Sequence, residues 1–178
     1  PLTPLRVELS DPGVDWPRSW QLARLPALGP QLSSFLFKLL HQLLPTAERV
    51  AKILPTSSPV CTQCGDKVVE TLLHALYACP ANLGLPHQLL VCLKDYDPSL
   101  TPQKILTLHL DVNIHLQLPI IWTIGTFLLS LWSARTDKRK VSLPAVRSEV
   151  EAACRILRES KFTNAGQITD QLVSALFN

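Results

Sequence analysis

Apolar stretches interrupted by proline recur along most of the chain and predict a series of helices. The first, residues 33–44, is rich in leucine and phenylalanine and ends at Pro45, so we expect a helix buried on nearly all sides. The second, residues 47–54, places apolar residues on one face and charged residues on the other, and Thr46 is placed to cap its start. This part of the chain is therefore predicted to be helical.

The rest of the chain contains more segments with helix start and stop signals. One of them opens with Thr-Pro at positions 101–102, where threonine can cap a helix and proline suits its first turn. The expected helices cover residues 69–78, residues 86–94, a short segment from residue 101, residues 144–161 and residues 165–177. Together they predict an all-α fold, an irregular bundle of about seven short helices.

Residues 116–134 contain no charged side chain and are followed by a basic segment, which is also the pattern of a membrane span with a positive flank. Polar residues and Pro119 dilute this tract below the roughly 20 apolar residues that a span needs. We therefore favour a buried core helix over residues 119–132, with a single-span membrane fragment as the weaker alternative. Its inward face is expected to carry Ile121, Ile124, Leu128 and Leu131.

The composition is that of a folded, helix-rich chain. Of the 178 residues, 47% are hydrophobic and 17% are charged, which excludes a disordered chain and indicates a large buried fraction or a missing partner. The 15 prolines and six glycines suit short helices separated by proline. Because the chain begins at Pro1 and contains no methionine, we expect it to be a fragment or a processed product.

Positive charge is concentrated near the C-terminus. The formal net charge of +3 is too small to indicate a nucleic-acid partner by itself, but residues 135–161 hold eight of the 17 basic residues and only four acids. Any contacts with phosphate are therefore expected from this stretch. The candidates are Lys138, Arg139, Lys140, Arg135, Arg147, Arg155 and Arg158.

Some of these cations have acidic neighbours at helical spacing. Glu151 lies one turn from Arg147 and from Arg155, so ion pairs are expected to occupy part of their charge. The three consecutive cations at positions 138–140 have only Asp137 nearby and are the better candidates for phosphate contacts.

The spacing of cysteine and histidine provides the one motif that carries chemistry. Cys61, Cys64, His74 and Cys79 follow the pattern C-x2-C-x9-H-x4-C, a ligand set of the CCHC zinc-knuckle type. A Cys-x-x-Cys turn brings two thiolates to one ion, and Gly65 supplies the freedom in φ that turns backbone N–H groups towards sulfur. His74 and Cys79 lie near the end of a predicted helix, where they can face the same side. Three sulfurs and one nitrogen suit one structural Zn²⁺ in tetrahedral coordination.

Two other uses of these cysteines are less well supported. Five cysteines in a chain without a secretion signal argue against a disulfide framework, although an unknown preceding segment keeps a secreted origin open. A redox Cys-x-x-Cys normally lies near a βαβ pattern, and no strand pattern precedes Cys61. Cys92 and Cys154 lie on apolar helix faces and are expected to be small buried hydrophobic residues. Histidines expected at the core edge or surface are His41, His87, His109 and His115.

Common catalytic motifs are missing from the sequence. It contains no G-x-G-x-x-G, no Walker lysine loop, no H-E-x-x-H and no G-x-S-x-G. A structural zinc site with four protein ligands leaves no open position for a substrate. We therefore expect no catalytic residues and no enzymatic activity in this chain.

The order of these features resembles a known family. An apolar helix ending in Leu-Pro-Thr at positions 44–46 is followed by the Cys-x-x-Cys pair, by Glu-Thr at positions 70–71 ahead of His74, and by Cys79. This order is similar to the zinc-binding region that lies C-terminal to the reverse transcriptase of LINE-type (non-LTR) retrotransposons. Residues 119–161, with Trp122 and Trp132, also resemble the polypeptide tail of such elements.

The resemblance implies that the four Cys and His residues bind zinc and that the domain binds element RNA or target DNA during target-primed reverse transcription. Polymerase and endonuclease activities belong to other parts of such polyproteins, and the Tyr-x-Asp-Asp box of the polymerase is absent here. The implied partners are an upstream reverse transcriptase domain and the phosphate backbone of RNA or DNA, read with low sequence specificity. We expect an intracellular protein of the nucleus and cytoplasm that has no membrane partner.

Combining these points, we expect an extended proline-rich arm over residues 1–30, a helical zinc-knuckle domain over residues 31–115, and C-terminal helices with a basic stretch packed on it over residues 116–178. The predicted function is a non-catalytic, zinc-stabilised nucleic-acid-binding module. The alternative is a zinc-stabilised helical protein-interaction domain, derived from a host gene or from a decayed copy of an element. The low share of charged residues favours this alternative, and the clustered basic stretch opposes it.

Overall fold

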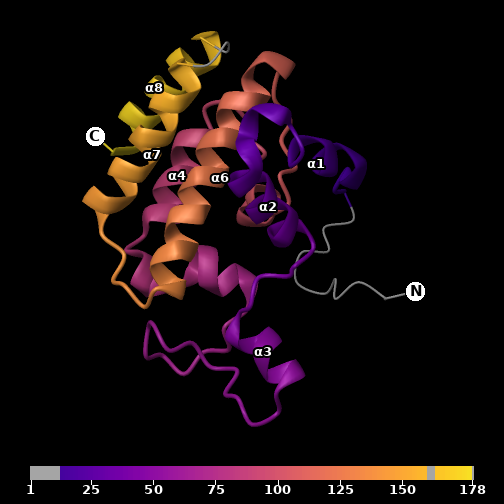
Figure 1. The fold of residues 1–178 in the computed structure, drawn as a ribbon, viewed down its shortest axis with the longest axis vertical. Coiled ribbons are helices and arrows are strands. Elements are labelled where there is room, and N and C mark those ends of the chain that lie inside the picture. Colours follow the sequence, from indigo (N-terminus) through magenta and orange to yellow (C-terminus); the bar gives the residue numbers. More distant parts are fainter. Residues whose placement is uncertain (1–12, 160–162, 178) are drawn as a thin grey trace.

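The computed structural model describes residues 13–159 and 163–177, and only the backbone of residues 158 and 163–166 (Figure 1). Its α-helices are α1 (Trp16–Leu22), α2 (Gly29–Leu40), α3 (Ala47–Ile53), α4 (Leu85–Leu93), α5 (Pro102–Leu106), α6 (Ile114–Thr136), α7 (Leu143–Glu159) and α8 (Thr163–Phe177). Short turns of other helix types are η1 (Pro26–Leu28), the π-helical η2 (His74–Ala78) and η3 (Pro80–Asn82). Within these residues the only strand-like pairing is an isolated bridge between Val60 and Val69. The predicted all-α class is confirmed.

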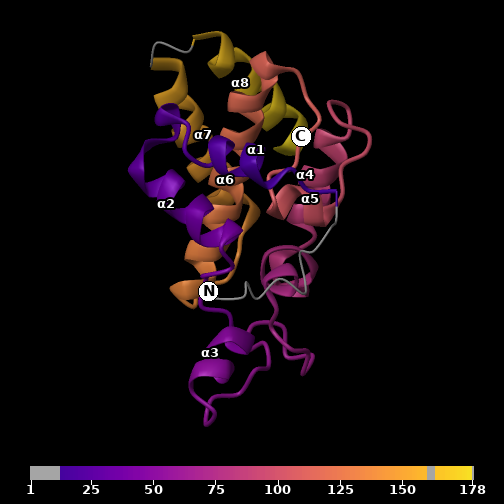
Figure 2. The same ribbon diagram turned by 90° about the vertical axis from the view of Figure 1, so that its right-hand side faces the viewer.

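Helix α6 is the centre of the bundle, and α2, α7 and α8 pack around it (Figures 1 and 2). The predicted inward face is buried, since Ile121, Ile124, Leu128 and Leu131 are at most 1% exposed. The opposite side is buried as well, with Ile120 at 1% and Phe127 at 0% exposed. The core helix that we expected is therefore present, but it is surrounded on nearly all sides rather than buried along one face.

The prediction for α2 is wrong, because this helix is buried on one face rather than on nearly all sides. This helix begins at Gly29 rather than near residue 33 and ends at Leu40, before the predicted end at residue 44. It buries one face, and Phe37 on the other side is 38% exposed. Its buried face lies against α6, where a Cβ on Gly125 would stand only 2.9 Å from Leu32 Cδ1. The absence of a side chain at Gly125 thus allows these two helices to pack closely.

Pro119 lies inside α6 rather than at its start. Asn113 caps the helix through its side-chain oxygen, which accepts the N–H of His115 at 3.0 Å. Proline in the second turn removes one backbone hydrogen bond, and the helix continues because packing on all sides stabilises it. α6 is long and apolar enough to cross a membrane by length and composition, and 67% of its most apolar stretch is buried in the molecule. A mostly buried core helix has the same properties.

Residues 16–30 do not form the extended arm that we expected, and residues 1–12 lie outside the described part of the chain. The side chain of Asp15 accepts the N–H of Arg18 and so caps α1, a helix that we did not predict. Leu22 and Leu28 are 4% and 3% exposed and belong to the same core cluster as α6. Trp20 stacks near His41, with ring centroids 4.2 Å apart. Helix α1 is thus part of the bundle.

The segment containing α3 and residues 54–71 projects from one end of the bundle (Figures 1 and 2). Helix α3 agrees with the prediction, including the cap at Thr46, whose side chain accepts the N–H of Arg49. No residue of α3 is buried, and Ile53 is 68% exposed. This segment is part of what we call the knuckle lobe (residues 46–84). Its helix α3 makes few apolar contacts, whereas Leu72, Ala75 and Leu76 further along the lobe belong to the main core cluster.

Candidate metal centre

A tight turn positions the first two cysteines of the motif. The N–H of Cys61 donates to the carbonyl of Val68 at 2.8 Å, so the chain returns on itself beyond Cys64. Gly65 adopts φ +75°, a left-handed conformation that costs glycine little and makes this return possible. Inside the turn, the N–H of Gln63 points at Cys61 Sγ at 3.4 Å. The turn therefore supplies both thiols and a backbone donor to one of them.

A short helical segment positions the other two residues. Thr71 accepts the N–H of His74 through its side-chain oxygen at 3.1 Å, which fixes the start of the segment. The wide π-helical turn η2 then ends with the N–H of Cys79 donating to the carbonyl of His74 at 2.8 Å. Because a π-turn spans five residues, it brings Cys79 under His74, and both side chains face the turn that carries Cys61.

These two segments bring all four predicted residues together. Their ligand atoms lie within 4.8 Å of one another, with Cys61 Sγ 3.9 Å from Cys79 Sγ and Cys64 Sγ 3.6 Å from His74 Nε2. In a tetrahedral metal site of this donor set, neighbouring ligand atoms stand roughly 3.5–3.8 Å apart. The cluster therefore fits one four-coordinate metal ion. Cys92 lies elsewhere and its thiol donates to the carbonyl of Ala175, as expected for a residue outside the motif.

A buried ion pair supports the cluster from the side of α6. Arg135, in the last turn of that helix, pairs with Glu70 and also donates from Nη2 to Cys61 Sγ at 3.1 Å. The side chains of Arg135 and Glu70 are only 9% and 8% exposed. Glu70 accepts the N–H of Ala47 as well, at 3.1 Å, so the same carboxylate holds the start of α3. One guanidinium thus connects a thiol of the cluster, the knuckle lobe and the central helix.

The thiols of Cys61 and Cys79 have pKa values that are shifted in opposite directions. Burial raises the pKa of Cys61, but the hydrogen bonds from Arg135 and from backbone N–H groups outweigh it and hold the pKa at about 6. Burial raises the pKa of Cys79 to about 11, and the neighbouring charge of Cys61 acts in the same direction. At neutral pH the side chain of Cys61 is therefore largely a thiolate before metal arrives, and the thiol of Cys79 must release its proton on binding.

Arg135 does not occupy the surface position that we expected from the sequence. We predicted a contact with phosphate, but its guanidinium is turned inward to Glu70 and Cys61. Sequence reasoning also missed Glu70 as its partner, because the two residues are 65 positions apart and nothing in either segment indicates the other. Arg135 is therefore not one of the surface cations available to phosphate.

The other predicted cations lie on the α6–α7 turn and on α7. Lys138, Arg139 and Lys140 are exposed, and Arg139 forms an exposed ion pair with Asp137 at 3.1 Å. On α7, Arg147 pairs with Glu151 as the spacing predicted, Arg155 is exposed, and the side chain of Arg158 lies outside the described residues. These predicted cations therefore belong to two elements, the turn after α6 and helix α7.

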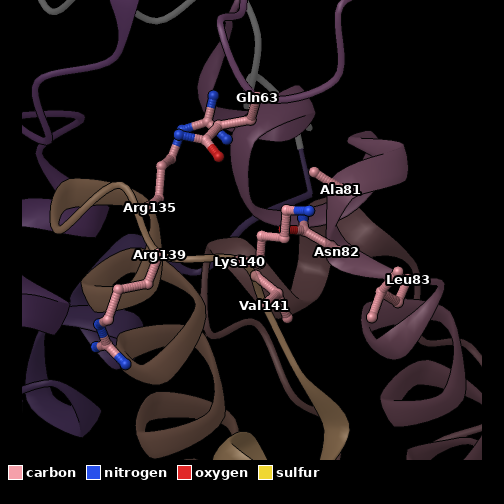
Figure 3. A pocket seen from close by; sticks show the side chains of 8 residues that line it. All are labelled: Gln63, Ala81, Asn82, Leu83, Arg135, Arg139, Lys140 and Val141. Atoms are coloured by element: carbon pink, nitrogen blue, oxygen red, sulfur yellow. The ribbon is translucent and has the colours of Figure 1, made fainter.

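The α6–α7 turn lies beside the knuckle lobe. Arg139, Lys140 and Val141 border a cavity of about 240 Å³ whose other wall includes Gln63 and Asn82 (Figure 3). The basic turn and the metal cluster, which were separate features in the sequence, are therefore neighbours. Comparisons of the chain with protein-family models, with curated proteins and with solved structures found no match.

Proposed function

We propose that the four-residue cluster binds one structural zinc ion. Three thiolates and one imidazole are the donors that zinc prefers, and the ligand-atom distances suit tetrahedral coordination without an open position. When bound, the ion supplies a cross-link between the Cys61 turn and η2. Such sites contribute folding energy and no catalysis, so the proposed function is non-catalytic.

We further propose that this zinc-stabilised module binds RNA or DNA beside a reverse transcriptase, as the resemblance to LINE-type elements implies. The observation that carries this proposal is the position of the cluster beside the exposed basic turn at residues 138–140, of which Arg139 and Lys140 border the same cavity as Gln63. Lysine and arginine on an exposed turn can approach phosphate without disturbing the fold. They bind the nucleic-acid backbone, so low sequence specificity is expected.

The test is binding of RNA and DNA at several salt concentrations by the wild-type chain and by a variant with Lys138, Arg139 and Lys140 replaced by alanine. The expected result is weaker binding of all sequences, with a log–log salt slope reduced by roughly 0.7–0.9 for each phosphate that the variant no longer neutralises. A variant with Arg24, Lys38 and Lys94 replaced by alanine removes the same charge from exposed positions on other elements and is the matched control. It should bind as the wild type does.

A protein-interaction function is the second candidate, and one observation favours it. The knuckle lobe exposes several large apolar side chains, namely Ile53, Leu54, Val68 and Val69, which are 43–68% exposed. Exposed apolar groups of this kind are typical of docking surfaces. If the alanine variant at residues 138–140 keeps the wild-type affinity and salt slope, the basic turn is only a solvated surface and the protein-interaction function replaces the nucleic-acid one.

A further inference from the structure

The cavity between the knuckle lobe and the α6–α7 turn has walls from two segments that are distant in the sequence. Gln63, Ala81, Asn82 and Leu83 form one side, and Lys140 and Val141 form the other (Figure 3). Its volume of about 240 Å³ is below the roughly 300–1,000 Å³ of sites for drug-sized ligands. The cavity is therefore suited to a single base-sized group rather than to a complete nucleotide cofactor.

The side chains around this cavity combine apolar surface with a few polar groups. Ala81, Leu83 and Val141 supply apolar walls, and Leu83 is 60% exposed. The side-chain amide of Gln63, which lines the cavity, carries the two donors and the acceptor that can meet the edge of a base. In Figure 3 the heads of Gln63 and Arg135 lie close together, while Arg139 points away from the other labelled side chains.

Charge is distributed around the cavity in a way that favours a nucleotide over a free apolar group. Lys140 is exposed, lines the cavity and forms no ion pair with any described residue. Arg135 also lines the cavity but is paired with Glu70. Among these lining cations Lys140 is therefore the one available to a phosphate, while the other lining residues offer apolar contact and hydrogen bonds.

The wall formed by the knuckle lobe is held in place before any ligand arrives. Asn82 is 3% exposed, and its side-chain amide donates to the carbonyl of Ala75 at 3.0 Å. The next residue, Leu83, adopts φ +56°, a left-handed conformation that a leucine rarely takes.

We propose that this cavity accepts one unpaired base of a single-stranded nucleic acid, with the adjacent phosphate at Lys140. This inference rests on the proposed nucleic-acid-binding function and makes it specific to single strands. The bases of a duplex are stacked and paired, so none of them can enter a cavity of this size without being extruded. A single strand exposes its bases, and contact with an apolar wall then adds to the attraction between phosphate and lysine.

Two variants test the cavity without removing any charge. Leu83→Asn deletes the apolar rim and keeps the fold, because asparagine tolerates the left-handed conformation better than leucine does. Ala81→Leu fills the cavity from the same wall. Val91→Asn, at an apolar side chain on α4 that is 54% exposed, is the matched control. The metal content of each variant is measured to show that the knuckle lobe is intact.

Binding is measured by fluorescence anisotropy with a labelled single-stranded RNA and with the duplex formed by that RNA and its complement. The expected result is a loss of single-strand affinity of roughly 5- to 100-fold in Leu83→Asn and Ala81→Leu, with unchanged duplex affinity. Val91→Asn should match the wild type with both probes.

Three results would overturn the proposal, and they separate it from the proposed function. If both cavity variants bind the single strand as tightly as the wild type, while the alanine variant at residues 138–140 loses affinity, the chain binds nucleic acid but not through this cavity. If single strand and duplex lose affinity equally, no base enters it. If the wild-type chain binds neither probe, the nucleic-acid function fails and the cavity proposal fails with it.

Discussion

Glu70 and Arg135 form a buried ion pair, and we expect replacement of either one alone to destabilise the fold strongly. Both side chains are less than 10% exposed, at 8% and 9%, so removal of Arg135 leaves the Glu70 carboxylate buried without a counterion, and removal of Glu70 leaves the buried guanidinium with only its contact to Cys61. Such a change typically costs about 3–5 kcal/mol. For a chain of this length, each kcal/mol lowers Tm by roughly 2–4 °C, so we expect a fall of about 6–20 °C.

The assay is urea unfolding of the metal-loaded chain with Glu70→Gln, Arg135→Met and the double variant. Glu70→Gln is the sharper single change, because glutamine keeps an oxygen that can accept the N–H of Ala47. The double variant removes both charges of the pair, so it should be more stable than the sum of the two single effects predicts, by about 2 kcal/mol or more. Metal content is recorded for each variant, since Arg135 also donates to Cys61.

An exposed ion pair in the same molecule provides the control. Arg147 and Glu151 are both 45% exposed, and solvent-exposed pairs contribute about 0–1 kcal/mol. Glu151→Gln should therefore change the free energy of unfolding by less than about 1 kcal/mol. This role of the buried pair would be refuted by two results together. Glu70→Gln would lower the free energy of unfolding no more than Glu151→Gln does, and its effect would simply add to that of Arg135→Met.

Four further predictions concern other parts of the structure. Leu128→Asp, at a side chain that is 1% exposed, should cost several kcal/mol in chemical denaturation, whereas Ile114→Asp, at a 69% exposed position in the first turn of α6, should be nearly neutral. Gly125→Val should cost about 1–3 kcal/mol by crowding Leu32, and a wild-type Tm in this variant would contradict the close packing of α2 on α6. Burial raises the pKa of Asp97, but hydrogen bonds from Ser99 and from the N–H of Asp111 outweigh it and lower the pKa below its usual 3.8. The carboxylate therefore stabilises the fold above pH 3.8, and this contribution is lost as the pH falls through the lowered pKa. The stability difference between the wild type and Asp97→Asn should accordingly shrink in acid. Chelation of the metal should expose the backbone amides of residues 47–79 to hydrogen exchange while α6 stays protected, and equal deprotection of both would count against a local role for the metal.

Local sequence signals predicted much of the helical architecture. Thr46 and Thr101 cap helices as their positions indicated, because a cap depends on residues only two or three positions away. The four metal-ligand candidates converge for a similar reason: each pair lies within six residues, and only one loop had to bring the pairs together. The spacing of a short motif therefore contained most of the geometry of the candidate site.

Features that depend on distant contacts could not be predicted in the same way. The sequence alone did not show that α6 is surrounded while α2 is buried on one face, because both are leucine-rich and only tertiary packing distinguishes them. Arg135 looked like one more cation of a basic stretch until the fold placed it against Glu70. The proximity of the basic turn to the knuckle lobe likewise depends on how the intervening chain folds, so the sequence alone could not predict it.

Binding of one zinc ion by Cys61, Cys64, His74 and Cys79 is the proposal on which the others depend. Its most direct test is the zinc content of the purified wild-type chain, of Cys64→Ser and of Cys92→Ser, measured by elemental analysis after dialysis against metal-free buffer. Cys64 is half-buried in the cluster, and Cys92 is half-buried outside it, so the two substitutions are matched in chemistry and burial. We expect one zinc per chain in the wild type and in Cys92→Ser, and little or none in Cys64→Ser. Equal zinc content in the two variants, or no zinc in the wild type, would contradict it.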